Sequence, residues 1–136
     1  MYNSILVPVE SSHIAESAAA LELAQRNGGE NCKIRLLNVF EEIPKWAAVN
    51  LPKHVVDDSI QTIEEEMQAV AKKSGANVET QIKIGHSYKT ILEVADEIGA
   101  ELIIVASNKP GQQNYLLGST AAKVVRHARC SILVLR

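Results

Sequence analysis

Aromatic side chains are scarce in this chain: they make up 4% of its 136 residues, whereas hydrophobic residues of all kinds make up 46%. A core must therefore consist mainly of Val, Ile, Leu and Ala. Cysteine is scarce too, because Cys32 and Cys130 are the two present and they lie far apart, without the spacing of a C-x-x-C motif. We expect both to be reduced, buried thiols of a cytoplasmic protein.

An excess of positive charge and a long apolar run are also absent. The formal net charge is −2, which gives no basic footprint for nucleic acid. No apolar stretch approaches the ~18 residues of a membrane span, and residues 1–4 lack the basic region of a signal peptide. The length suits one layered core, so we expect a single domain, residues 1–136, in the cytoplasm.

Apolar runs that suit strands alternate with segments of helical periodicity. The runs lie at 4–9, 33–40, 78–84, 102–105 and 131–135, and the helical segments at about 11–27, 55–74, 87–98 and 119–128. This alternation predicts an α/β fold with three layers, in which helices cover both faces of a five-stranded parallel sheet. Residues 78–84 alternate apolar and polar side chains, as a half-exposed edge strand does. Pro8 cannot donate a ladder hydrogen bond and belongs at the carboxyl end of the first strand.

The last quarter of the chain carries the clearest functional signal. A buried apolar run, 102–105, leads into a polar loop, and Gly118-Ser119-Thr120 then opens a helix. The first N–H groups of a helix have no partners inside it, so they form a site for an anion such as phosphate. The alternative is that Gly118 and Ser119 only turn the chain and cap the helix.

The same segment resembles the end of the universal stress protein family. Nucleotide-binding members of that family carry Gly-x-x-Gly, a spacer of about nine residues, and then Gly-Ser or Gly-Thr. Here the loop reads Ala106-Ser107-Asn108-Lys109, so Ala106 and Lys109 replace both glycines, and residues 110–117 form a shorter spacer before Gly118-Ser119. The basic residue before Pro110, then Tyr-Leu-Leu-Gly-Ser and Val-Val-Arg-His-Ala, resemble the small single-domain subgroup called universal stress protein F.

This resemblance implies the strand order 3-2-1-4-5 and an ATP site where the first and fourth strands end. Ligands of such sheets bind outside the carboxyl ends of the strands, where the winding direction reverses. The implied ATP-binding residues, with Mg²⁺ bound beside the nucleotide and AMP or ADP as alternative ligands, are Pro8, Val9, Glu10, Val39, Ala106, Ser107, Lys109, Gly118, Ser119 and Thr120.

Several of these residues have an expected role and an alternative one. The family holds adenine through the main chain of the residue that matches Val39, which is also a plain core residue. Glu10 stands where the family usually has Asp beside the ribose and the metal; the alternative is a solvated acid near a helix start. Lys109 could neutralise phosphate charge or remain a solvated loop lysine. Gly85 could approach the ligand or serve as an ordinary turn glycine.

Three functions fit these residues. We expect an ATP-binding regulator of the stress response; a weak ATPase or autokinase and a scaffold without nucleotide are the alternatives. No Walker A motif is present and no Ser-His-Asp set can be placed, so no catalytic residue is assigned. The two missing loop glycines favour the scaffold, because Ala106 and Lys109 allow fewer main-chain conformations.

Two further expectations concern surfaces. The apolar strand 131–135 should lie at a sheet edge, and exposed edges pair with other chains. With the resemblance, this predicts a homodimer through antiparallel pairing of Ile132 to Leu135. The long segment 41–53 contains Trp46, which could cover the nucleotide pocket; we expect it to pack on the flank of the domain instead.

Overall fold

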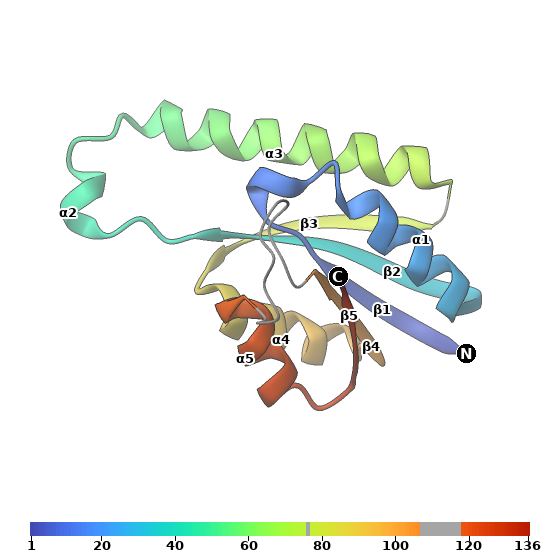
Figure 1. The fold of residues 1–136 in the computed structure, drawn as a ribbon. Coiled ribbons are helices and arrows are strands. Elements are labelled where there is room, and N and C mark those ends of the chain that lie inside the picture. Colours follow the sequence, from blue (N-terminus) through green and yellow to red (C-terminus); the bar gives the residue numbers. More distant parts are fainter. Residues whose placement is uncertain (76, 107–117) are drawn as a thin grey trace.

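Five parallel strands form one sheet in the order β3-β2-β1-β4-β5 in the computed structural model of the protein (Figure 1). The structure describes residues 1–75, 77–106 and 118–136. The strands are β1 (Tyr2–Pro8), β2 (Gly28–Glu41), β3 (Val78–Gly85), β4 (Leu102–Ala106) and β5 (Ser131–Leu135). The strand order and the parallel direction confirm the fold predicted from the sequence.

Helices cover both faces of this sheet. Figure 1 shows α1 (Ser17–Asn27) and α3 (Lys53–Ser74) on one side, and α4 (Ser87–Ile98) and α5 (Ser119–His127) on the other. Two short helices, η1 (Ser11–His13) and α2 (Lys45–Ala48), follow β1 and β2. Gly75 and Gly99 end α3 and α4 at φ angles of 70° and 62°, in the left-handed region that glycine adopts without strain.

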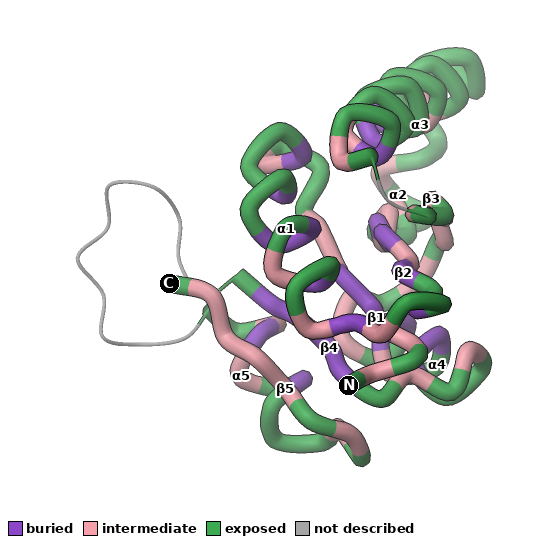
Figure 2. Tube along the Cα trace, turned by 90° about the vertical axis from the view of Figure 1, so that its right-hand side faces the viewer, coloured by how far each residue is buried: buried purple, intermediate pink, exposed green. Residues whose placement is uncertain are grey.

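Successive residues of β1 enter two different cores, because side chains alternate across a strand. Ile5 lies in the core beneath α1 and α3, together with Met67 of α3. Leu6 lies in the other core, with Val94 of α4 and Val124 of α5. Figure 2 shows the buried residues gathered in the central strands, while the outer surface of α3 is exposed. The large side chains that are fully buried are Ile, Leu and Val apart from Met67 and Asn38, as the shortage of aromatic residues predicts.

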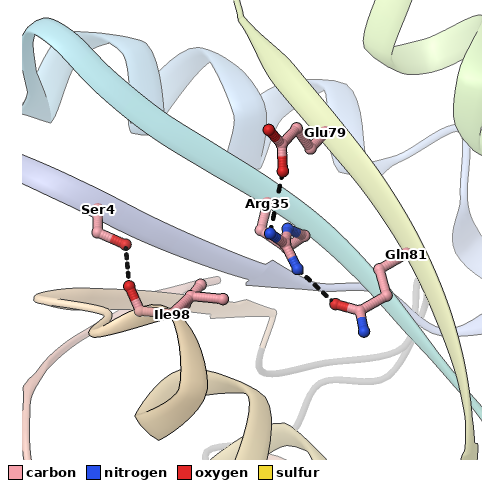
Figure 3. Close-up of polar contacts among 5 residues, drawn as sticks. All are labelled: Ser4, Arg35, Glu79, Gln81 and Ile98. Atoms are coloured by element: carbon pink, nitrogen blue, oxygen red, sulfur yellow. Dashed lines mark hydrogen bonds and ion pairs between the residues drawn. The ribbon is translucent and has the colours of Figure 1, made fainter.

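A polar contact holds the edge strand β3 to β2. The Arg35 guanidinium donates one hydrogen bond to Gln81 Oε1 (2.6 Å) and one to Glu79 Oε2 (2.9 Å), as Figure 3 shows. Glu79 and Gln81 lie two residues apart on β3, so they project from the same face of the strand. The same figure shows Ser4 Oγ of β1 donating to the Ile98 carbonyl at the end of α4 (3.3 Å).

Three local expectations were wrong. Strand β2 begins at Gly28 rather than at 33, and Gly28 sits so close to Cys32 that an added Cβ would lie 2.7 Å from Cys32 Cβ. The helix expected from about residue 11 starts as the short η1, and α1 begins only at Ser17. Trp46 does not pack on the flank of the protein, because 80% of it is exposed.

Candidate functional site

Strands β1 and β4 separate before they end. Their pairing covers Ile5–Leu102 and Leu6–Ile103 among the described residues, whereas the pairing of β1 with β2 continues to Pro8–Leu37. Strand β4 in turn stays paired with β5 up to its last residue, Ala106. The chain thus opens between β1 and β4 at their carboxyl ends, which is the switch point where ligands bind in sheets of this type.

The segment after β1 is held against β2. Pro8 ends β1, and the N–H of Val9 donates to the Leu37 carbonyl at 2.8 Å. Glu10 is exposed and extended (φ −78°, ψ 146°), and its carbonyl accepts the His13 N–H at 3.0 Å, which begins η1. The Glu10 carboxylate therefore lies at the surface of this edge, where it can meet a ribose or a bound cation.

The main chain of Val39 faces this opening. The Leu37 carbonyl points toward β1, because it accepts the Val9 N–H. Main-chain groups of residues two apart in a strand point the same way, so the N–H and C=O of Val39 also point toward the β1 side. Strand β1 has ended at Pro8, so the edge of β2 at Val39 offers one donor and one acceptor to a planar ligand.

The side-chain amide of Asn38, in β2, binds the segment that follows β1. Asn38 is 1% exposed, and its Nδ2 donates to the Val9 carbonyl and to Ser11 Oγ, both at 3.0 Å. The Val9 carbonyl can only accept, which fixes the orientation of the amide. Asn38 Oδ1 has no hydrogen-bond partner among the described residues. The two hydrogen bonds from Nδ2 fix the course of residues 9–11.

The amino end of α5 reaches the same edge of the sheet. Helix α5 runs back from the carboxyl end of β4 to the start of β5, so its first turn lies where the strands end. The Gly118 carbonyl accepts the Ala122 N–H at 2.9 Å, and no side chain caps the helix. The N–H groups of Ser119 and Thr120 consequently have no partner within the helix, and Gly118 and Ser119 are exposed. This arrangement suits an anion.

Gly118 has φ −58° and ψ 157°, a conformation open to any residue. The position therefore does not require glycine for the course of the main chain. Glycine at this position has no side chain that could stand in front of the helix end.

The sequence-derived site residues fall into two groups. Eight of them lie on the carboxyl edge, at the ends of β1, β2 and β4 and the start of α5: Pro8, Val9, Glu10, Val39, Ala106, Gly118, Ser119 and Thr120. Ser107 and Lys109 lie outside the described residues. Sequence reasoning missed Asn38 and Ser11; the signal that could have found Asn38 is a polar residue inside the apolar run of β2.

Gly85 has a packing role. A Cβ at Gly85 would lie 2.5 Å from Thr90 Oγ1, and Thr90 is buried in α4. The glycine lets β3 end against this helix, so the turn interpretation is the one that the structure supports.

Neither cysteine has the character of a nucleophile. Burial raises the pKa of the Cys32 thiol, and the nearby Glu101 carboxylate raises it further. Burial also raises the pKa of Cys130. Both thiols are thus less ionised at neutral pH than an exposed cysteine. No group of three or more His, Cys, Asp or Glu side chains is placed to hold a metal in the described ranges 1–75, 77–106 and 118–136.

The comparison with protein families gives one match over the full length. The model described as the universal stress protein family matches residues 1–136. Universal stress protein G of Shigella flexneri is 27% identical over 147 residues, and the match covers 100% of both chains. Because that relative has the G designation, the likeness to the F subgroup stays a prediction.

Solved structures share the fold over nearly the whole chain. A universal stress protein of Lactobacillus plantarum is 29% identical, with a TM-score of 0.75 over 99% of this chain and 98% of that one. A universal stress protein solved in complex with cAMP has a TM-score of 0.71 at 22% identity, over 99% and 97% of the two chains. One from Archaeoglobus fulgidus in complex with dAMP has a TM-score of 0.63 at 18% identity, over 99% and 98%. Among its described residues, the present chain has no helix that is long and apolar enough to cross a membrane.

Proposed function

This chain belongs to the universal stress protein family, and we propose that it is a stress-response regulator that binds ATP in the opening between β1 and β4. One observation carries the proposal. The main-chain edge at Val39 and the first turn of α5 lie at the same edge of the sheet, beside the strands that separate, and no described residue pairs with the first on the β1 side or caps the second. The first suits a base that pairs through one donor and one acceptor, and the second suits phosphate.

Each candidate residue has a role in this proposal. The main chain of Val39 binds adenine, and the N–H groups of Ser119 and Thr120, with Ser119 Oγ, bind phosphate oxygens in front of Gly118. Pro8, Val9 and Glu10 border the ribose, and Glu10 contacts Mg²⁺ that arrives with the nucleotide.

Three more residues border the phosphates. Ala106, at the end of β4, leads into the segment whose Ser107 and Lys109 are proposed to contact them. No residue of the described chain is assigned to bond cleavage, so the protein is proposed as a binder in the cytoplasm rather than as an enzyme.

Two structures of this fold support an adenine nucleotide as the ligand class. Their names give cAMP and dAMP as ligands, both of which combine adenine, a sugar and one phosphate. An alternative function is supported by one feature of the present chain: Ala106 and Lys109 replace the two glycines of the family motif. Those replacements favour a scaffold that binds no nucleotide.

The test is titration calorimetry of the purified protein with ATP, ADP, AMP, cAMP and GTP, each with and without Mg²⁺. We expect binding of ATP but not of GTP, because the base is read through the main chain at Val39 in the pattern that adenine presents. Mass spectrometry of the supernatant from denatured protein should show which nucleotide copurifies. No binding of any adenine nucleotide at millimolar concentration would favour the scaffold.

We also propose a homodimer through β5. This strand lies at the edge of the sheet, and Ile132 to Leu135 are only partly buried. An edge strand offers unpaired main-chain groups to a second chain. Light scattering should give a dimer for the wild type and a monomer for a folded Leu133→Pro variant. A wild-type monomer at micromolar concentration, or a Leu133→Pro variant that dimerises normally, would contradict this proposal.

A further inference from the structure

An apolar segment projects from the carboxyl edge of the sheet. Residues 42–52, here called the arm, connect β2 to α3 and include α2; Figure 1 shows α2 standing away from the sheet. Trp46 is 80% exposed and Val49 is 81% exposed, and Leu51 is exposed as well. Val55, near the start of α3, is exposed too.

The exposed apolar side chains of the arm occur close together in the sequence, unlike the single exposed apolar residues of an ordinary surface. Seven large apolar side chains are conspicuously exposed among the described residues, and four of them lie on the arm or at the start of α3: Trp46, Val49, Leu51 and Val55. Contiguous exposed apolar surface marks a site of protein interaction. Moreover, α2 has four residues, and a single helical turn is marginal in water without packing. The arm therefore has the character of a segment that is stabilised by a partner.

The same chain has a groove that suits the arm. It lies between α3 and β3, has a volume of about 260 Å³, and is lined by Ile60, Glu64, Met67, Thr80, Gln81, Ile82 and Ile84. Met67 is fully buried and forms part of its floor, while Ile84 is 58% exposed. An apolar cavity of about 150 Å³ holds benzene, so this larger groove has room for an indole ring.

Charge also matches between arm and groove. Lys45 precedes Trp46 and is exposed, and Glu64 lines the groove and is exposed. A Trp46 ring in the groove would bring the Lys45 ammonium near the Glu64 carboxylate. The arm thus has a cation beside Trp46, and the groove has an anion in its lining.

We propose that the arm of one copy of this chain docks in the α3–β3 groove of a second copy, with Trp46 in the groove and Lys45 beside Glu64. Because each copy has one arm and one groove, two copies can exchange arms around a two-fold axis. The groove borders β3, at the opposite edge of the sheet from β5. This contact therefore uses the other edge of the sheet from the β5 dimer, and the two contacts together would give assemblies larger than a dimer.

The only tryptophan of the chain reports on this contact directly. Fluorescence emission of Trp46 should be recorded over a wide range of protein concentration, together with sedimentation velocity, for the wild type and for Leu133→Pro. We expect emission to shift to shorter wavelength as mass increases, and the shift to persist in Leu133→Pro. Emission that is shifted at every concentration, with no change in mass, would place the arm in its own groove. Emission that stays that of an exposed indole while the protein associates would also overturn the proposal.

Charge reversal identifies the partner surface. Lys45→Glu and Glu64→Lys should each weaken the association by about tenfold or more, which corresponds to about 1.4 kcal/mol. An equal mixture of the two variants should associate within about threefold of the wild type, because both contacts in each mixed pair then join opposite charges. Glu66→Lys is the matched control, since Glu66 is exposed on the same helix but does not line the groove. A mixture that associates no better than either variant alone, or a control that behaves like Glu64→Lys, would contradict the assignment.

Discussion

Two segments leave neighbouring strands at the same edge of the sheet, and they are held in opposite ways. Residues 9–13 follow β1 and are fixed by hydrogen bonds from Val9 N–H to Leu37 and from Asn38 to Val9 and Ser11. The arm follows β2 and carries the most exposed apolar side chains in this part of the molecule, Trp46 and Val49. The polar groups of the first segment are hydrogen-bonded to β2, whereas the apolar side chains of the second are exposed to solvent.

This difference indicates two kinds of recognition at one edge. A small polar ligand needs donors and acceptors in fixed positions, since positioning lowers the cost of binding. An apolar arm gains free energy only when its side chains leave water. The first segment suits a nucleotide and the second suits another protein surface, so changes on one side should leave the other side unaffected.

The largest effect is expected from filling the space in front of α5. Gly118→Val places a branched side chain where a phosphate would approach, and the φ and ψ angles of Gly118 are accessible to valine. Loss of two hydrogen bonds to a charged group, each about 1.5–3 kcal/mol, should abolish measurable ATP binding in calorimetry. Association through the arm should not change.

Gly118→Ala is the matched control, because a methyl group blocks less of the approach and should reduce affinity by a smaller factor. Circular dichroism establishes that both variants are folded. If Gly118→Val binds ATP as well as the wild type, the phosphate site lies elsewhere.

Removing the side-chain amide of Asn38 should lower both the free energy of unfolding and the affinity for ATP. Asn38→Ala leaves the Val9 carbonyl without its buried donor, so the free energy of unfolding should fall by about 1–3 kcal/mol. ATP affinity should fall as well, because residues 9–11 lose their fixed course.

Urea unfolding followed by circular dichroism measures the first effect, and calorimetry on the folded variant measures the second. Asn31→Ala, at an exposed position of β2, is the control. An Asn38→Ala variant that is destabilised but binds ATP normally would show that Asn38 has no positioning role at the site.

A smaller effect on affinity is expected from Ser119→Ala. Ser119 is the first helical residue rather than the cap, and no side chain caps α5. The change therefore removes one hydroxyl and keeps the main-chain donors, which should weaken ATP binding by a few-fold to about a hundredfold without lowering the melting temperature. Calorimetry and thermal unfolding together check this; a loss of stability without a loss of affinity would point to a purely structural serine.

Truncating the arm should leave stability almost unchanged. Trp46→Ala removes the largest side chain of the arm, but 80% of that residue is exposed in the structure. The free energy of unfolding of the dilute protein should change by less than about 0.5 kcal/mol, as measured by urea unfolding with circular dichroism. A much larger loss would mean that the arm packs within its own chain, and the contrast with Asn38→Ala would disappear.

The sequence predicted the sheet well because β1, β2, β4 and β5 contain apolar runs and a glycine follows each of α1, α3 and α4. Gly75 and Gly99 both adopt the left-handed conformation expected of helix stops. The start of β2 could not be predicted in this way, since Gly-Gly-Glu-Asn has no apolar period and the pairing with β1 shifts register between Tyr2–Gly28 and Ser4–Lys33.

The errors near the site have a common physical cause. A helix was expected from about residue 11, but the Ser11 hydroxyl accepts a hydrogen bond from Asn38, 27 residues away, and α1 begins later at Ser17. Trp46 looked like a packing residue, but the described chain offers it no burial. Sequence patterns carry information about residues that are near in sequence. The conformation of Ser11 is set by a residue far away in sequence, and the partner proposed for Trp46 is on another chain.

The smallest effect on ATP affinity is expected at the proposed adenine contact. The N–H and C=O of Val39 face the side where β1 has ended, and the side chain of Val39 is partly buried in the core beneath α4 and α5. Val39→Ile keeps the β-branch that suits a strand, so the main-chain donor and acceptor should stay in place. ATP affinity in calorimetry should therefore change by less than about tenfold, or about 1.4 kcal/mol. Val39→Pro is the contrasting variant, because proline removes the N–H that the proposal assigns to adenine. If a folded Val39→Pro protein binds ATP as tightly as Val39→Ile, the base does not pair with this edge of β2, and the polar segment after β1 has to account for the ligand by itself.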